Sequence, residues 1–135
     1  MFGAKSTKPQ TRIDSLIGSG TRIEGNIVFS GGLRVDGEIR GDVRAADGQA
    51  TTLVVSEQAR IEGEIRVAHL VVNGTIVGPV HATEFLELQP RSRVSGDVHY
   101  SALEMHLGAV VEGRLVHAPS AAEAKPVELK LAKSG

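Results

Sequence analysis

The side chains of this sequence that could do chemistry are five histidines and a set of carboxylates beside glycines. Histidine can bind a metal or move protons near neutral pH, and paired carboxylates can serve as general acid and general base. His81 and His99 occupy equivalent positions of a repeated motif, so we expect both to point outward on one face, whereas His69, His106 and His117 are scattered. Cysteine is absent, which excludes disulfides, a thiolate nucleophile and a cysteine zinc site.

Neither group of side chains has the pattern of a catalytic or metal site. No His-x-x-x-His motif or carboxylate triad supports zinc, so the sequence predicts surface histidines, no metal and no cofactor. The acidic residues beside the glycines recur in nearly every repeat, among them Glu24, Glu62, Asp97 and Glu112, and arginines lie between them. A repeated ladder of opposite charges is typical of a solvated face. Because no position is unique, we expect the chain not to be an enzyme.

The elements that carry these residues are repeats. The pattern aliphatic-x-Gly-x-aliphatic occurs six times, at glycine spacings of 16, 22, 15, 18 and 17 residues. A second apolar column precedes the last five copies: Leu33/Val35, Leu53/Val55, Leu70/Val72, Leu86/Leu88 and Leu103/Met105. The longest spacing contains an insertion around Ala46–Thr52, with a loop signal at Asp47-Gly48.

The repeats predict an all-β fold, a single-stranded parallel β-helix of about six coils. Apolar and polar residues alternate at period two around the motifs, which indicates strands rather than helices. Strands this short cannot pair as hairpins and keep the register, but coils of about 17 residues can stack about 4.8 Å apart. We expect structural turn glycines at the corners, where positive φ costs them little: Gly25, Gly37, Gly41, Gly63, Gly74, Gly78, Gly96 and Gly113. A narrow aliphatic coil also explains why only 3% of the residues are aromatic.

Charge divides the chain into three parts. All five lysines lie in a flexible basic head (residues 1–14) or in a tail (residues 119–135) whose composition is typical of disorder. The core, residues 15–118, has nine arginines against thirteen acidic residues, so nucleic acid is not an expected partner. No apolar run approaches the roughly 18 residues of a membrane span, and no secretory signal is evident. These features make the cytoplasm the default location.

Three segments resemble the bactofilins: V-D-G-E-I-R-G-D-V (35–43), V-N-G-T-I-V-G-P-V (72–80) and I-G-S-G-T-R-I-E-G-N-I (17–27). The resemblance covers about residues 12–118. It implies a bacterial cytoskeletal protein with a right-handed β-helix core, which polymerises end to end into filaments without nucleotide. It further implies a scaffold that localises partners such as cell-wall hydrolases or synthases.

The resemblance also bears on the head of the chain. Many members of that family bind the inner face of the cytoplasmic membrane through a segment that begins Met-Phe and carries lysines. The corresponding residues here are Met1, Phe2, Lys5 and Lys8. The resemblance therefore implies a peripheral membrane protein, with the head as the candidate membrane-targeting segment.

A β-helix has two open ends, each with unpaired backbone groups and a cross-section of apolar core. Solenoids normally cover their ends with polar caps, but Pro119 follows the last repeat almost at once and no capping helix is evident. We expect the two ends to be the polymerisation surfaces. Their predicted residues are Ile17, Ile23 and Ile27 at one end, and Leu103, Met105, Leu107, Val111 and Leu115 at the other.

Two other functions stay open at this point. The run from Ile17 to Ile23 imitates the repeat of the hexapeptide-type β-helix acyltransferases, although the four-residue step from Ile23 to Ile27 breaks a strict period of six. A soluble β-helix binding scaffold that does not polymerise is the second alternative. A polysaccharide lyase would need a longer helix with Lys, Arg and Asp grouped on one face, and the core has no lysine. A calcium-binding β-roll would need repeated Gly-Gly-x-Gly-x-Asp, which is absent.

Overall fold

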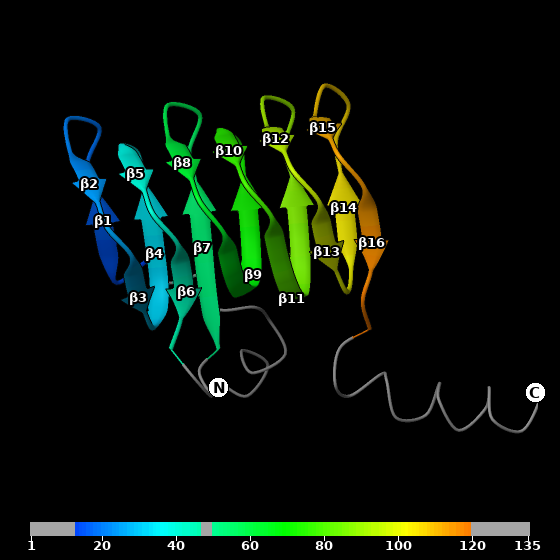
Figure 1. Cartoon of the computed structure of the whole chain (residues 1–135), viewed down its shortest axis with the longest axis horizontal. Coiled ribbons are helices and arrows are strands. Elements are labelled where there is room, and N and C mark those ends of the chain that lie inside the picture. Colours follow the sequence, from blue (N-terminus) through cyan, green and yellow to red (C-terminus); the bar gives the residue numbers. More distant parts are fainter. Residues whose placement is uncertain (1–12, 47–49, 120–135) are drawn as a thin grey trace, which may run out of the picture.

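The computed structural model describes residues 13–46 and 50–119, and these form sixteen short strands and no helix. All pairings between the strands are parallel. The strands wind into six coils stacked along a rod (Figure 1): residues 15–29, 31–45, 51–67, 69–82, 85–100 and 103–117, numbered coil 1 to coil 6. The predicted all-β solenoid of about six turns is confirmed.

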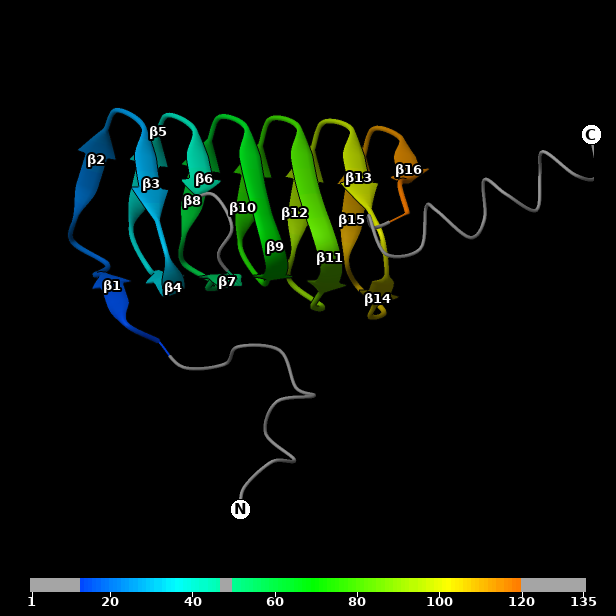
Figure 2. The same ribbon diagram turned by 90° about the horizontal axis from the view of Figure 1, so that it is seen from below.

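Each coil contributes one strand to each of three columns. The first column contains β1 (Ser15–Ile17), β4 (Gly31–Val35), β7 (Thr51–Val55), the second halves of β9 (Ile65–Val72) and β11 (Val80–Leu88), and β14 (Leu103–Met105). The second contains β2 (Arg22–Glu24), β5 (Glu38–Arg40), β8 (Arg60–Glu62), β10 (Thr75–Val77), β12 (Arg93–Ser95) and β15 (Val110–Glu112). The third contains β3 (Ile27–Phe29), β6 (Val43–Ala45), the first halves of β9 and β11, β13 (Val98–Tyr100) and β16 (Leu115–His117). Figure 2 shows the coils side by side from β2 and β3 to β16.

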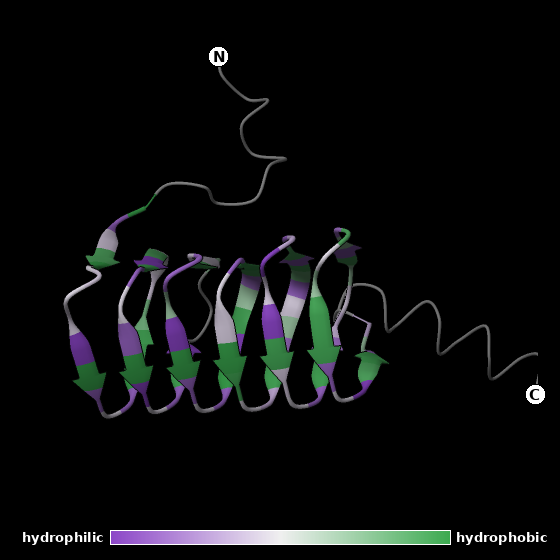
Figure 3. Cartoon of the chain, turned by 90° about the horizontal axis from the view of Figure 1, so that it is seen from above, coloured by the Kyte–Doolittle hydropathy of each residue, from purple (hydrophilic) through white to green (hydrophobic). Residues whose placement is uncertain are grey.

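Aliphatic ladders along the columns build the core. In the second column, the paired positions are Ile23, Ile39, Ile61, Ile76, Val94 and Val111. The four inner members of this ladder are fully buried. Figure 3 shows hydrophobic and hydrophilic residues following one another along the strands. Each coil is too narrow to bury its own apolar face, so the core forms only because neighbouring coils cover one another.

Two kinds of turn join the first column to the second. The four longer turns are closed by a hydrogen bond from the N–H of the fourth residue to the carbonyl of the first: Gly18 to Thr21, Ser56 to Ala59, Gln89 to Ser92 and His106 to Ala109. The two shorter turns contain Asp36-Gly37 and Asn73-Gly74. Figure 1 shows the difference as tall loops beside β2, β8, β12 and β15 and low ones beside β5 and β10.

The turn glycines fall into two groups with different requirements. The six motif glycines have φ between 138° and 154°, a region that favours glycine. A Cβ on Gly63 would also collide with the carbonyl oxygen of Gly41 in the preceding coil. Gly37 and Gly74 do not have the expected positive φ. Their requirement is steric, because a Cβ on Gly74 would collide with the carbonyl oxygen of Ser56.

Parts of the predicted organisation lie outside the described residues. These are the head up to residue 12, the middle of the insertion at 47–49, and the tail from residue 120. The insertion occurs where it was predicted, between the end of β6 at Ala45 and the start of β7 at Thr51. Within residues 13–46 and 50–119, no helix has the length and hydropathy needed to cross a membrane.

Candidate assembly surfaces

The strands of coil 1 and coil 6 lie at the ends of their ladders. β1, β2 and β3 pair with β4, β5 and β6, and β14, β15 and β16 pair with β11, β12 and β13. In the described part of the chain, no strand or helix lies against their outer edges. Such edges present backbone donors and acceptors to any further strand that approaches. The two ends are therefore the candidate sites of assembly.

The first end, formed by coil 1, carries apolar residues on its inward face and also on its outward face. Ile17, Ile23 and Ile27 pack inward against the core but are only partly buried. Leu16 and Val28 point the other way and are exposed. The first three residues were predicted from the sequence, whereas Leu16 and Val28 were not, because the predicted end surfaces contained only inward residues of the repeats. Coil 1 thus offers more apolar surface than was predicted.

The second end, formed by coil 6, is apolar on its inward face. Leu103 and Val111 are partly buried, whereas Met105 and Leu115 are 44% and 43% exposed. Leu107 lies elsewhere: it is the second residue of the turn from His106 to Ala109 and is 96% exposed. The structure therefore brings four of the five predicted residues to the open cross-section and places Leu107 beside it.

One inward column carries rings only toward the ends of the rod. Its positions, in chain order, are Phe29, Ala45, Val67, Ala82, Tyr100 and His117. The ring centroids of Tyr100 and His117 lie 5.7 Å apart, and His117 Nε2 lies 3.0 Å from the carbonyl oxygen of Ser101. Small residues fill the central coils, while larger side chains remain partly accessible in the outer ones. This adds Phe29 to the surface of the first end.

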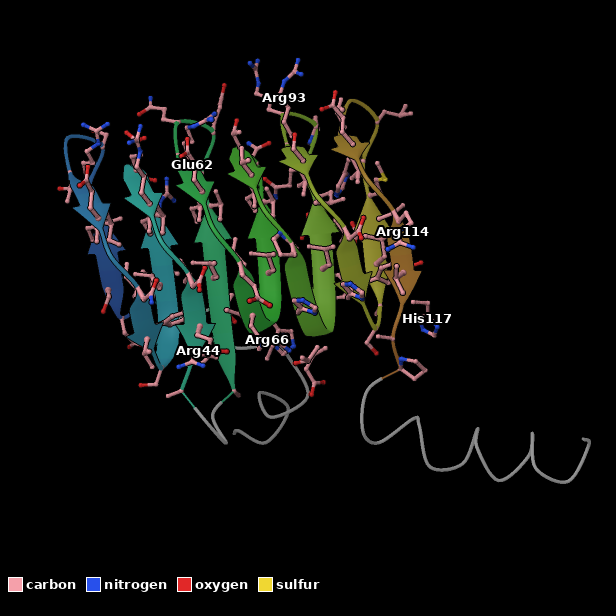
Figure 4. All side chains as sticks on the ribbon, viewed as in Figure 1. Arg44, Glu62, Arg66, Arg93, Arg114 and His117 are labelled. Atoms are coloured by element: carbon pink, nitrogen blue, oxygen red, sulfur yellow. The ribbon has the colours of Figure 1, made fainter. Side chains whose placement is uncertain are left out.

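His81 and His99 form a stacked pair on the outer face of the third column. Their ring centroids are 4.5 Å apart with an angle of 7° between the planes, in directly paired positions of β11 and β13. His81 Nε2 lies 3.2 Å from Glu64. Partial burial, with the charges of Arg66 and His99, lowers the pKa of His81. Arg66 is paired with His81 on the neighbouring strand, and Arg44 is paired with Arg66 on the next one. Figure 4 shows the two arginines on neighbouring strands.

The outer face of the second column is a ladder of ion pairs. Arg40 lies 3.6 Å from Glu38 and 3.7 Å from Glu62, and Arg60 lies 2.7 Å from Glu62. The hydrogen bond from Arg60 lowers the pKa of Glu62. A general acid would need the opposite, a carboxyl group whose pKa is raised by its surroundings. The chemistry of this face is that of a solvated charge ladder.

Coil 6 has a similar exposed pair. Arg114 donates a 2.8 Å hydrogen bond from its guanidinium to Asp97 in coil 5, and its backbone N–H donates a second one of 3.1 Å. These hydrogen bonds lower the pKa of Asp97, and the pKa of Arg114 is raised by the same contact. Arg114 is labelled on the last coil in Figure 4.

A further cluster of polar side chains, on the outer face of the first column, was not predicted from the sequence. Glu87 of β11, Glu104 of β14 and His106 of the following turn place three potential ligand atoms within 4.8 Å of one another. His106 was interpreted as an isolated surface histidine. The signal that could have found it is the repeat of 17 residues, which sets Glu87 directly beside Glu104 with His106 two positions further on the same face.

Comparisons with known proteins agree with this geometry. The family model described as "Bactofilin: Polymer-forming cytoskeletal" matches residues 15–116, which are coils 1 to 6. Bactofilin BacP of Myxococcus xanthus (strain DK1622) is 27% identical over 116 residues, which is 85% of this chain and 47% of that protein. The chain thus spans about half the length of this relative. No solved structure matches the chain. On the match over the whole rod, the chain belongs to the bactofilin family, whose members are polymer-forming cytoskeletal proteins.

Proposed function

We propose that this bactofilin is a structural scaffold whose copies join end to end, without nucleotide, through coil 1 and coil 6. The observation that supports the proposal is the open cross-section at each end. Inward residues that are fully buried in the central coils, such as Ile61, are partly exposed at the ends, as Ile23 and Val111 are in the same ladder. Within residues 13–46 and 50–119, no strand pairs with the outer edges that surround this apolar surface.

End-to-end contact would satisfy both kinds of exposed group at once. A further strand added to a sheet edge forms main-chain hydrogen bonds, and side-chain contacts then supply specificity. The inward residues of the two joined ends would cover each other as those of neighbouring coils do inside the rod. Completing the burial of a large aliphatic side chain is worth about 1 kcal/mol when half of it is already buried. Several such side chains at each end make the contact favourable without any bound nucleotide.

The test replaces one apolar residue of the open cross-section by a charged residue. We expect Leu115→Asp to abolish filaments in negative-stain electron microscopy and to move the protein from the void volume of a sizing column to a small species. The matched control is Val77→Asp on β10, which changes a residue of similar exposure, 37% against 43%, on the side of the rod. It should keep the filaments. Circular dichroism verifies that both variants retain their strands.

The size of the residual species shows which ends meet. A contact between like ends is isologous, so blocking coil 6 leaves dimers joined through coil 1. A contact between unlike ends leaves monomers. Ile27→Asp makes the same change at the other end and should also abolish filaments. A wild-type chain that stays a monodisperse monomer at high concentration would contradict assembly and favour a binding scaffold that does not polymerise.

The proposal extends to a cytoplasmic filament held at the inner face of the membrane by residues outside the described part of the chain, Met1, Phe2, Lys5 and Lys8. Burial of one phenylalanine is worth about 2 kcal/mol, and each lysine near an anionic surface about 1 kcal/mol. One such head binds weakly. A filament presents many heads together, and multivalency converts weak sites into firm attachment.

Liposome co-sedimentation tests this attachment. Deletion of residues 1–8 should release filaments from anionic vesicles, and Leu115→Asp should weaken binding by removing multivalency. The control variant carries Lys130→Gln and Lys133→Gln, which removes two lysines from the tail and leaves the head intact. Unchanged binding after deletion of the head would rule the head out as the attachment site.

Recruitment of partners completes the proposed function. A filament repeats each outer face of the rod, including the Arg–Glu ladder and the stacked histidines, at every subunit. Such a surface can collect many copies of a partner, for example a cell-wall hydrolase or synthase, along one line at the membrane. Support for this step comes from the membership of a cytoskeletal family.

A further inference from the structure

Three side chains with metal-binding atoms converge on the outer face of the first column, next to the second end of the rod. Glu87 and Glu104 are directly paired in β11 and β14. His106 Nε2 lies 3.1 Å from Glu87 Oε2 and 3.1 Å from Glu104 Oε2. All three side chains are partly exposed, with Glu87 the least so. A small ion can therefore reach them from solvent.

The charge balance at this cluster differs from that of the other faces. Carboxylates such as Glu38, Glu62 and Asp97 lie beside arginines. Among the described residues, the ion pairs of Glu87 and Glu104 go to His106 and to no arginine or lysine. Directly opposed like charges on neighbouring strands are unfavourable. A bound cation would therefore be favourable beside these two carboxylates, because no arginine or lysine among the described residues forms an ion pair with them.

A proton on His106 cannot fully compensate the negative charge of the two carboxylates. The imidazole directs one atom, Nε2, toward both carboxylates, and a single N–H donates a well-aligned hydrogen bond to only one acceptor. A protonated ring would also leave a net charge of −1 on the cluster. A divalent cation bound by a neutral ring and two carboxylates contacts all three groups and leaves no net charge.

The separations of His106 from the two carboxylates suit a tetrahedral metal. Zinc bonds to histidine nitrogen and carboxylate oxygen are about 2.0 to 2.2 Å long, so two ligand atoms on a tetrahedron lie about 3.3 Å apart. The two distances of 3.1 Å are close to this value. Gln89 also lies 3.3 Å from Glu87 Oε2 through its Nε2, as an outer hydrogen-bond partner that can orient a ligand.

The backbone holds the three ligands in place without a metal. Parallel pairing of β11 and β14 sets Glu87 beside Glu104, and the backbone N–H of His106 donates a 2.9 Å hydrogen bond to the carbonyl of Leu88. Leu86 and Leu88 are fully buried on the other side of the strand, so Glu87 must point outward. The metal would therefore have to order only the side chains, and not the backbone that carries them.

We infer that Glu87, Glu104 and His106 form a binding site for a divalent transition-metal cation of the zinc type. An imidazole nitrogen disfavours Mg²⁺ and Ca²⁺, which prefer all-oxygen sites. With three protein ligands, one coordination position remains for water or for a group from another molecule. The bound ion links coil 5 to coil 6, so it stabilises the terminal coil. This site does not depend on assembly of the chain.

The test is titration of the full chain, first treated with EDTA, with Zn²⁺ alone in a calorimeter. We expect about one equivalent to bind to the wild type and to raise its melting temperature, because a ligand that binds the folded state stabilises it. His106→Gln and Glu104→Gln should each weaken binding by at least about tenfold, since changes to partners beyond the ligands already cost that much. Replacing Zn²⁺ by Co²⁺ should give visible absorption bands that disappear in the same variants.

The control variant is His81→Gln with His99→Gln, which removes the other candidate cluster of imidazoles and Glu64. It should bind Zn²⁺ as the wild type does. Wild-type protein that binds no Zn²⁺ would overturn the inference and leave His106 as a simple ion-pair partner. Equal affinities in the wild type, His106→Gln and Glu104→Gln would also overturn it, as would loss of binding in the control variant alone.

Discussion

Ile23 and Ile61 are the same residue type in the same ladder, yet Ile61 in coil 3 is 0% exposed while Ile23 in coil 1 is only partly buried. The same contrast separates Val94 from Val111 at the other end. Side-chain chemistry does not produce the difference. Inner coils have a neighbour on each side, and terminal coils have a neighbour on one side only.

This comparison between the inner and the terminal coils explains where assembly can occur. A solenoid with polar caps would show a change of residue type at its ends. Here the ladder of the second column keeps its aliphatic residues in both terminal coils, as Ile23 in coil 1 and Val111 in coil 6. The two ends differ at one outer position, because coil 1 carries Leu16 in the first column where coil 6 carries Glu104. In the third column both ends carry valine at the equivalent outer position, Val28 in coil 1 and Val116 in coil 6.

The largest expected difference between inner and terminal coils concerns the motif glycines. Gly25 and Gly63 have φ of 138° and 151°, so alanine strains the backbone at both, by about 1 to 3 kcal/mol. At Gly63 the new Cβ would also collide with the carbonyl oxygen of Gly41. At Gly25, no atom of the described residues other than its two chain neighbours lies within 4 Å of an added Cβ. We expect Gly63→Ala to lower the free energy of unfolding by more than about 4 kcal/mol, and Gly25→Ala by much less.

Urea unfolding followed by circular dichroism measures both variants, in the Leu115→Asp background so that filaments do not interfere. Equal losses would show that torsional strain alone decides the effect and that the stacked glycines do not need close contact. A larger loss at Gly25 would mean that coil 1 is covered even in the unassembled chain.

The second comparison removes aliphatic volume from the same ladder. Ile61→Ala creates a cavity in a fully buried site and should cost about 4 kcal/mol of unfolding free energy. Ile23→Ala should cost about 1 to 2 kcal/mol, because the side chain is already partly in contact with water and solvent can fill the space. Urea unfolding of the non-assembling Leu115→Asp chain measures this gap.

Assembly should reduce the difference between the stability losses of Ile61→Ala and Ile23→Ala. If copies join end to end as proposed, Ile23 becomes an inner residue of a longer ladder. Ile23→Ala, made in the chain that keeps Leu115, should then assemble only at a higher protein concentration than the wild type does. Light scattering against protein concentration measures this. No change in that concentration would contradict a role of Ile23 in the contact.

Most of the fold was predictable because every coil repeats the same register. The spacing of the glycines aligned Ile23 with Ile39 and Ile61, and the strand pairing is the same. Leu107 was assigned to the open cross-section because it continues the alternation from Leu103 and Met105. The strand ends at Met105, and the turn from His106 to Ala109 carries Leu107 into solvent.

The sites were less predictable than the ladders for a physical reason. Burial is dictated by the period of the apolar residues, which can be counted in the sequence. The convergence of Glu87, Glu104 and His106 depends on side-chain torsions and on the exit direction of a turn. Likewise, Gly37 and Gly74 were assigned to positive φ because the sequence marks a glycine without showing that a carbonyl of the preceding coil lies against it.

A smaller effect is expected from pH in an inner coil. Partial burial of His81, helped by Arg66 and His99, lowers its pKa in the folded state. The unfolded chain then binds the proton first, so stability is complete above the usual histidine pKa and falls as the pH drops from there toward the folded pKa. We expect His81→Gln to reduce this loss of stability between about pH 7 and pH 5.

Arg66→Gln is the matched variant for that measurement. It removes one of the charges that lower the pKa of His81 but leaves burial, the main cause, in place. The pH dependence of the melting temperature should therefore become weaker without disappearing. A pH dependence unchanged in His81→Gln would mean that other groups titrate in this range.

The smallest expected effect concerns the exposed pair of Asp97 and Arg114, which joins coil 5 to coil 6. Hydrogen bonds from Arg114 lower the pKa of Asp97 in the folded state, so the pair adds stability above the usual aspartate pKa, and that stability is lost as the pH falls through the folded pKa. Both side chains are solvated, and surface ion pairs contribute little, so the pKa itself is the better measurement. Carboxyl chemical shifts across a pH titration should give Asp97 a pKa below its usual range in the wild type and a higher one in Arg114→Gln.

Two conditions separate the causes of that shift at the terminal coil. High salt screens the attraction between the charges but leaves the backbone hydrogen bond from Arg114 N–H to Asp97, 3.1 Å long, in place. The pKa of Asp97 should thus rise only part of the way in 1 M salt, and only part of the way in Arg114→Gln, which keeps the backbone N–H. Arg93→Gln, on the turn side of coil 5, should leave it unchanged. A full return to the usual value in Arg114→Gln would mean that the backbone of coil 6 does not stay paired at this point, and that the terminal coil opens where an inner coil would remain closed.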